Sequence, residues 1–231
     1  MLKLSRTVRA TALTLGTLGF VGVPAASAAE VVVPGKCYVT VPGTGSQIIP
    51  VTVTGLAPSQ NVQLSLLVKD RVVSGIPSLT ADATGGIISS IDGWTSGLGT
   101  GPTRSTKASV VVSDLATGAA VGQTDFKVSN VGFKVDGAFK RGNVKRVWEI
   151  SGLASLTESQ GGGKVYYAHY FKGSKKVGKQ RLGKSTDACG YIRVKKPLLP
   201  FRKRGSFKVV VQASTVYNPD LFSVGGTVTA S

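Results

Sequence analysis

An internal repeat with a period of about one hundred residues restricts the fold of this chain more than any other feature. Three pairs of segments match in the same order: VTVTGLA (51–57) with WEISGLA (148–154), TADATGGI (80–87) with STDACGYI (185–192), and SVVVSD (109–114) with KVVVQA (208–213). The spacings are 97, 105 and 99 residues, and the spacing of 105 is consistent with an inserted loop such as TESQGGG (157–163). Colinear matches at a nearly constant period predict two copies of one structural unit.

Each copy alternates apolar and polar residues over short runs. These runs are PVTVTGL, VQLSLLV, ASVVVSD, KVYYAHYF, YIRVKK and FKVVVQA, and residues such as Gly, Pro, Asn and Asp lie between them. A period of two in segments rich in Val, Ile, Thr and Tyr predicts strands with one buried face. About seven such strands per hundred residues bury these faces most simply as two packed antiparallel sheets. We therefore expect an all-β protein with two tandem immunoglobulin-like β-sandwich domains, in which Trp94 and Trp148 are packing residues.

The N-terminus has the pattern of an export signal. A basic start, MLKLSRTVR, precedes an apolar run over residues 10–23 and the small residues Ala26, Ser27 and Ala28. The apolar run is too short to span a bilayer, and A-x-A is typical of a signal-peptide cleavage site. We expect residues 1–28 to be a cleaved signal peptide and the mature protein to be secreted, without a transmembrane segment. A retained N-terminal membrane anchor is the alternative.

Positive charge is concentrated in the second copy. Residues 29–130 contain six basic and six acidic side chains, whereas residues 131–231 contain nineteen basic and five acidic ones. Aromatic residues follow the same border, with three in the first range and twelve in the second. This change in composition predicts a near-neutral immunoglobulin-like domain at 29–130 and a strongly basic one at 131–231.

The basic residues of the second copy gather in two clusters. They are Lys172, Lys175, Lys176, Lys179, Arg181 and Lys184 around a predicted hairpin, and Arg193, Lys195, Lys196, Arg202, Lys203 and Arg204 around KKPLLPF. Neighbouring strands can merge the clusters into one positive face, which attracts polyanions through counterion release. The alternative is a solvated surface without a selective site. Tyr166, Tyr167 and Tyr170 lie beside the first cluster, but alternation places at least one face of their strand in the core. No RNA- or DNA-binding signature accompanies the charge, so nucleic acid is not specifically supported as a partner.

The two cysteines, Cys37 and Cys189, lie at non-equivalent positions of the repeat. Cys189 aligns with Thr84, whereas Cys37 belongs to the opening strand KCYVTV, so neither copy can close a bridge within itself. An exported chain usually pairs its cysteines, and the first expectation is a Cys37–Cys189 disulfide that ties one domain to the other. Two buried free thiols or a bridge between molecules are the alternatives.

The sequence lacks the patterns of a catalytic or metal site. A catalytic thiolate needs a base, and His169 is the single histidine. It lies on the strand face of Val165, Tyr167 and Phe171, and we expect a structural, at least partly buried side chain. CxxC, HxxxH, HExxH and GxSxG are absent, and the glycine runs at 97–102 and 161–165 do not meet the spacing of a dinucleotide or phosphate loop. We predict a protein that is not an enzyme and that has no metal or cofactor.

Two parts of the chain resemble known exported proteins. IIPVTVTGLAPSQNVQLSLL resembles the bacterial immunoglobulin-like modules of secreted proteins from Gram-positive, high-GC bacteria, in which a strand runs into the pattern seen here as Gly55, Leu56, Ala57 and Pro58. YAHYFKGSKKVGKQRLGK, ACGYIRV and PLLPF resemble a domain recurrent in uncharacterised exported proteins of the same bacteria. The second copy departs from the pattern because Ser155 stands where the matching Pro is expected. The resemblance covers most of the mature chain and implies a fold more than an activity.

These observations predict a secreted, non-catalytic immunoglobulin-like protein that associates with the cell envelope or cell wall. Its basic second domain is expected to bind an anionic envelope polymer, such as a teichoic acid or an acidic polysaccharide, by electrostatic attraction. The alternative is a structural or protein-interaction module that recognises an envelope protein through sheet edges or the neutral first domain. In that case the positive charge is incidental.

Overall fold

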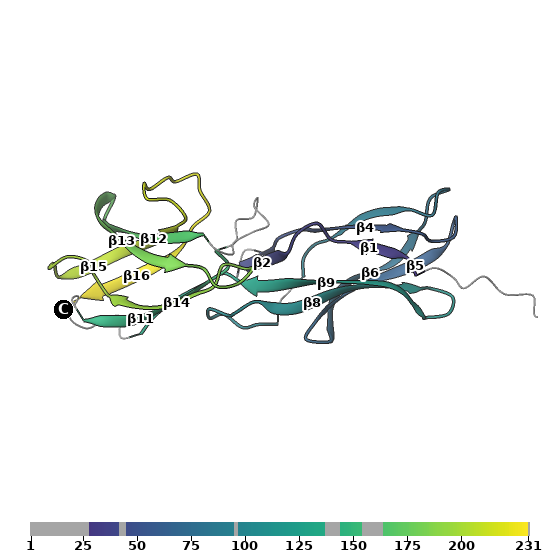
Figure 1. The fold of residues 1–231 in the computed structure, drawn as a ribbon, viewed down its shortest axis with the longest axis horizontal. Helices are drawn as coiled ribbons and strands as arrows, with labels where there is room; N and C mark the ends of the chain where they lie inside the picture. Colours follow the sequence, from purple (N-terminus) through teal and green to yellow (C-terminus); the bar gives the residue numbers. More distant parts are fainter. Residues whose placement is uncertain (1–27, 42–44, 95–96, 137–143, 154–163, 231) are drawn as a thin grey trace, which may run out of the picture.

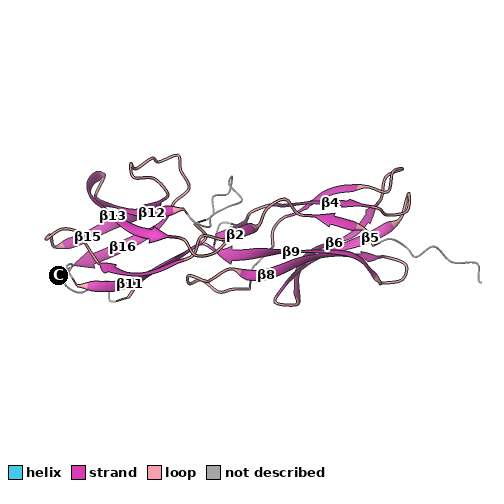
Figure 2. Ribbon diagram, viewed as in Figure 1, coloured by secondary structure: helices cyan, strands magenta, loops and turns pink. Residues whose placement is uncertain are grey.

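The computed structural model describes residues 28–41, 45–94, 97–136, 144–153 and 164–230, and in these ranges it contains strands, turns and loops but no helix (Figure 2). Nearly all of the predicted signal peptide lies outside the described residues, as do TESQGGG and Ser155. The strands of the first half are β1 (Glu30–Val32), β2 (Cys37–Val41), β3 (Gly45–Ser46), β4 (Ile49–Thr54), β5 (Asn61–Val68), β6 (Arg71–Thr80), β7 (Ile87–Ile91), β8 (Thr106–Asp114) and β9 (Ala120–Asn130). Those of the second half are β10 (Gly132–Val135), β11 (Lys145–Ser151), β12 (Val165–Lys172), β13 (Lys175–Lys184), β14 (Ile192–Pro197), β15 (Gly205–Gln212) and β16 (Val224–Ala230).

The strand order of the first half recurs in the second. The sheet β1-β4-β7 corresponds to β10-β11-β14, and the order β9-β8-β5-β6 corresponds to β16-β15-β12-β13. Gly55 and Gly152 follow the corresponding strands β4 and β11, and their φ angles are 85° and 70°. Glycine adopts this left-handed conformation without the steric cost that a side chain adds, which explains why it recurs at both turns. The protein is therefore all-β, and the predicted pair of tandem immunoglobulin-like β-sandwiches is confirmed.

The first sandwich has two strands, β2 and β3, without a counterpart among the described strands of the second. β1 opens the described fold, and the chain then crosses to the other sheet, where Cys37 begins β2. β2 pairs in parallel with β9, from Cys37 opposite Lys127 to Thr40 opposite Asn130. The expectation of purely antiparallel sheets is thus wrong at the β2–β9 pair, and Cys37 lies on the second strand and not on the opening one. A parallel pair results because the crossover brings β2 to the free side of β9 in the same direction.

Each sandwich has its own hydrophobic core between its two sheets. Val51 and Trp148 occupy equivalent repeat positions, and both side chains are fully buried in their respective cores. Trp94 is also buried, and its Nε1 donates a hydrogen bond to the carbonyl oxygen of Gln47 over 2.7 Å. Both tryptophans are therefore packing residues, as predicted.

A disulfide joins the two sandwiches, which lie end to end (Figure 1). Cys37 of β2 is bonded to Cys189 in the turn before β14, and their Cα atoms lie 5.3 Å apart. The bridge is buried together with Val39, and the partly buried side chain of Val131 packs against it. The predicted interdomain disulfide is confirmed. Such a bridge is typical of proteins that function outside the reducing cytosol.

Polar contacts extend the junction on one side of the disulfide. The Oδ1 atom of Asp187 accepts hydrogen bonds from the backbone N–H groups of Cys189 and Tyr191, both over 3.0 Å. Its Oδ2 atom accepts one from the N–H of Ser105 in the first sandwich, over 2.9 Å. The Arg104 guanidinium lies over the Tyr191 ring, 5.4 Å from its centroid. Asp187 thus orders its own turn and connects that turn to the other sandwich.

Candidate polyanion-binding surface

The two basic clusters meet along one side of the second sandwich. β13 is the edge strand of the four-stranded sheet, and β14 is the edge strand of the three-stranded sheet. Gln180 Nε2 of β13 donates a hydrogen bond to the Pro197 carbonyl of β14 over 3.3 Å. A Cβ atom at Gly178 would lie only 2.6 Å from the ring of Phe201, so glycine permits this approach. We call the basic residues of these two strands the cationic edge: Lys175, Lys176, Lys179, Arg181, Lys184, Arg193, Lys195 and Lys196.

Two β-bulges turn the cations of β13 toward one face of its sheet. In the register with β12, Lys176 pairs with Phe171, Lys179 with His169, Arg181 with Tyr167, and Lys184 with Val165. The register shifts between Tyr166 and Tyr167 and again between Tyr170 and Phe171. Because each bulge adds one residue to β13, cations at irregular spacings share a face that a period of two would not give them. All four are exposed, whereas the alternate β12 residues Tyr166, Ala168 and Tyr170 point into the core.

The second cluster divides between β14 and the loop that follows it. Arg193 and Lys195 are exposed on β14, whereas Lys196 is half-buried. Arg202, Lys203 and Arg204 are exposed in the loop before β15. Gly205, which follows this loop, pairs with Ala230, so the loop lies beside the C-terminal end of β16, far from the junction (Figure 1). Lys172 and Lys175 flank the tip of the β12–β13 hairpin and are also exposed.

The cationic edge carries little compensating negative charge. Glu149 of β11 lies 3.8 Å from Arg193, measured from Oε1 to Nε, and its carboxylate also accepts a hydrogen bond from the Tyr191 hydroxyl. Of the twelve predicted basic residues, Arg193 is the one with an acidic side chain within 4 Å among the described residues. Lys179 Nζ instead donates to the carbonyl oxygen of Thr215 over 3.2 Å. The edge therefore has an excess of unpaired positive charge that can attract a polyanion.

The structure adds two residues that the sequence interpretation did not assign to this surface. Lys208 of β15 pairs with Phe171, so it lies in one cross-strand row with Lys176. Tyr217, in the loop between β15 and β16, packs its ring against that of Phe171 with centroids 4.7 Å apart. The alternation in FKVVVQA indicates that Lys208 points away from the core, but only the strand order places it near β13. No local pattern indicates where the Tyr217 loop folds.

His169 is a buried structural residue beneath this loop, as expected. Its Nε2 atom lies 3.0 Å from the carbonyl oxygen of Ser214, which it contacts as a donor in the neutral tautomer. Burial lowers the pKa of His169, and the positive charges of Lys176 and Lys179 lower it further, against the opposing effect of the Ser214 hydrogen bond. The imidazole is therefore held neutral, and among the described residues it contacts the Ser214 carbonyl and the Tyr217 ring.

Neither a metal site nor a membrane helix is seen in the part of the chain that the structure describes. Within the described ranges, no three His, Cys, Asp or Glu side chains gather closely enough to hold a metal ion. In those same ranges, no helix has the length and hydropathy needed to cross a membrane.

No protein-family model matches the chain, and no curated protein matches it. Among solved structures, the Escherichia coli adhesin FdeC is 12% identical over 89% of this chain, which spans 65% of the FdeC chain at a TM-score of 0.40. The periplasmic chaperone SfaE is 11% identical over 87% of this chain and 98% of its own, at a TM-score of 0.29. A β-glucuronidase of Bifidobacterium dentium is 14% identical over 51% of this chain, which spans only 22% of the enzyme, also at a TM-score of 0.29. The immunoglobulin-like architecture rests on the strand order and the two cores, and these similarities add no argument about function.

Proposed function

We propose that this protein is a secreted, non-catalytic module that binds an anionic polymer of the cell envelope, such as a teichoic acid or an acidic polysaccharide. The binding surface is the cationic edge, extended by Lys172 at the hairpin and by the basic loop 202–204. The observation that supports the proposal is that the neighbouring edge strands β13 and β14 bring cations of both clusters together, where one described acidic side chain, Glu149 of β11, lies within 4 Å of them.

The physical basis of this binding is the release of counterions. A flexible polyanion that follows β13 and β14 meets exposed lysines and arginines on both sides of the sandwich edge, because Lys176 and Arg193 belong to different sheets. Each polymer charge neutralised in this way releases a condensed cation, and the logarithm of the affinity falls linearly with that of the salt concentration. Exposed cations gain little from isolated pairs, so many contacts are needed to hold the polymer.

A salt series on a purified polyanion tests the proposal. The triple variant Lys176→Glu, Lys179→Glu, Arg181→Glu is compared with the unchanged protein for binding to heparin and to isolated bacterial walls. We expect the affinity to fall by at least about tenfold, and the slope of log affinity against log salt to decrease by roughly two to three, from about 0.7–0.9 per lost charge contact.

The matched control moves the same charge change to the first sandwich. Lys36→Glu, Lys69→Glu and Lys127→Glu alter three exposed lysines there and leave the cationic edge intact. This control is expected to retain most of the affinity and slope. Equal losses in the two triple variants would indicate attraction to net charge alone and would contradict a defined surface.

A protein partner is the second candidate, and the edge strand β6 of the first sandwich favours it. β6 pairs with β5 on one side only, and the side chain of Val72 is 67% exposed. An open edge can accept a strand from another protein. However, Pro77 and two register shifts interrupt β6, and such features protect natural sheet edges from pairing. Wall binding that is insensitive to salt and to the Lys176 triple variant would favour this candidate.

A further inference from the structure

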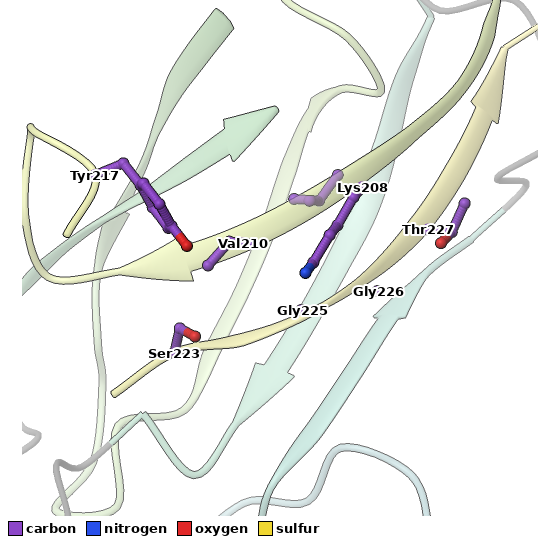
Figure 3. Close-up of a pocket in the computed structure, with 8 residues that line it drawn as sticks. Lys208, Val210, Tyr217, Ser223, Gly225, Gly226 and Thr227 are labelled. Atoms are coloured by element: carbon purple, nitrogen blue, oxygen red, sulfur yellow. The ribbon is translucent and has the colours of Figure 1, made fainter. Parts of the chain in front are cut away.

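A pocket opens on the outer face of the four-stranded sheet, over β15 and β16, and β12 separates it from the cationic strand β13 (Figure 3). It has a volume of about 360 Å³, at the lower end of the range for small-ligand sites. Its residues come from β15, β16 and the loop between them: Lys208, Val209, Val210, Tyr217, Ser223, Gly225, Gly226 and Thr227. The row Lys176–Phe171–Lys208–Thr227 crosses four paired strands and connects the pocket with the cations of β13.

The polar groups of this pocket surround an open floor, with Ser223 and Thr227 toward opposite ends of the β16 segment (Figure 3). Figure 3 shows the Tyr217 hydroxyl directed toward Val210 and the Lys208 ammonium directed toward Gly225. The hydroxyls of Ser223 and Thr227 lie on the β16 side of the same space. These four side chains have no hydrogen-bond or ion-pair partner among the described residues, so the pocket presents one cation and three hydroxyls that are available to a ligand.

Gly225 keeps the floor of the pocket bare. It pairs with Val210, and a Cβ atom added to it would lie 2.0 Å from the carbonyl oxygen of Val209. A side chain is therefore excluded at this position, and a ligand can approach the backbone of the sheet closely. The Tyr217 ring forms a wall of the pocket and is held in place by its contacts with Phe171 and His169.

We propose that this pocket binds one acidic sugar unit, a hexuronate residue of an anionic polysaccharide. Lys208 would pair with the carboxylate, the Tyr217 hydroxyl and one hydroxyl of the β16 side would bond the ring hydroxyls, and the apolar face of the pyranose would lie along the Tyr217 wall and Val210. A single ammonium matches a single carboxylate. An aromatic wall and several hydroxyls suit a ring that is apolar on its face and polar around its rim. The inference rests on the proposed function, because it selects the acidic polysaccharide among the anionic polymers.

NMR titration of the ¹⁵N-labelled protein with sodium D-galacturonate tests the pocket directly. We expect saturable shifts of the amide signals of Val210, Tyr217 and Gly225. D-galactose, which lacks the carboxylate, is expected to bind at least about tenfold more weakly, since a charge-assisted hydrogen bond is lost. The same loss is expected for the variant Lys208→Gln, whereas Lys208→Arg retains binding. The control variant Lys36→Gln removes an exposed cation from the first sandwich, outside both the pocket and the cationic edge, and is expected to bind galacturonate normally.

Several outcomes would overturn the inference. Equal affinity for galactose and galacturonate, or unchanged binding by Lys208→Gln, would show that the pocket does not recognise an acidic sugar. Equal or stronger shifts with glycerol phosphate would assign it to a phosphate polymer instead. Tyr217→Phe, which keeps the aromatic wall, supplies a second variant and is expected to weaken binding by a few-fold through the loss of one hydroxyl.

Failure of the pocket and failure of the proposed function can be told apart. If the cationic-edge triple variant loses heparin and wall binding while galacturonate produces no shifts, the polymer-binding proposal stands and the sugar assignment is wrong. If galacturonate binds in the pocket but wall binding is independent of salt and of the cationic edge, the electrostatic proposal fails and the pocket remains a sugar site.

Discussion

At the scale of single residues, His169 makes stability depend on pH. Its burial lowers its pKa below the ordinary value of 6.5. Between that value and the lower pKa of the folded protein, the unfolded chain binds a proton that the folded protein does not. The contribution of neutral His169 to the free energy of unfolding is therefore fully present above about pH 6.5. This contribution decreases as the pH falls toward the pKa of His169 in the folded protein. Urea unfolding between about pH 7 and about pH 5.5 is expected to show a decreasing free energy of unfolding, before most carboxylates titrate.

The variant His169→Gln provides the control for this pH dependence. Glutamine can still donate to the Ser214 carbonyl, but it does not titrate. The slope of stability against pH in this window is expected to disappear in the variant, even if its absolute stability is lower. A slope that is identical in both proteins would assign the effect to other groups.

At the scale of elements, the repeated turn contains an equivalent aspartate in each half, Asp82 and Asp187. Asp82 bonds within its own turn, whereas Asp187 also bonds across the junction. Asp82 accepts hydrogen bonds from the N–H groups of Thr84 and Gly86, both over 2.8 Å, within its own turn. Asp187 makes the corresponding bonds and also holds the N–H of Ser105 across the junction. The two halves thus have the same hydrogen-bonded turn. In the second half, the other carboxylate oxygen of Asp187, Oδ2, makes the interdomain contact.

Replacing each aspartate with alanine separates these two roles. Both variants lose the hydrogen bonds within their own turn and are expected to be less stable than the unchanged protein. Only Asp187→Ala leaves the Ser105 N–H without its acceptor, so hydrogen exchange at that amide is expected to accelerate in this variant and not in Asp82→Ala. Unchanged exchange at Ser105 in Asp187→Ala would show that the junction does not depend on this contact.

At the scale of the whole molecule, the disulfide and the Asp187 contact join two independent cores into one elongated body (Figure 1). Because of this connection, the cationic edge of the second sandwich has a defined orientation relative to the first sandwich. In the chain-entropy description, closing a loop across 152 residues stabilises the folded state by on the order of 5 kcal/mol.

The double variant Cys37→Ala, Cys189→Ala tests both consequences of the bridge. Denaturant unfolding is expected to show a loss of several kcal/mol relative to the oxidised protein. Residual dipolar couplings from the two sandwiches are expected to fit one alignment tensor in the oxidised protein and two in the variant, because the orientation is no longer held. One common tensor in both proteins would show that the polar contacts and the short connection alone fix the orientation.

Much of this architecture could be predicted because it is encoded locally. A strand with one buried face needs a period of two, and a left-handed turn needs a residue such as Gly55 or Gly152, so the repeat of these patterns indicates two similar sandwiches. The interdomain disulfide was the first expectation for two cysteines at non-equivalent repeat positions of an exported chain, and the structure selects it over free thiols or a bridge between molecules. The signal peptide, the Gram-positive origin and the identity of the bound polymer remain predictions.

The candidate site depended on information that lies outside any local pattern. Two bulges decide that Lys176, Lys179, Arg181 and Lys184 share a face, and bulges arise from the pairing of β13 with β12. Lys208 joins that surface only through the strand order, and the pocket exists only because the Tyr217 loop folds back over β15. Short-range alternation and turn chemistry therefore determined the elements and their two cores from the sequence. Tertiary packing decided where the charges meet, since proximity between distant segments is set by sheet register and loop closure and not by the order of residues along the chain.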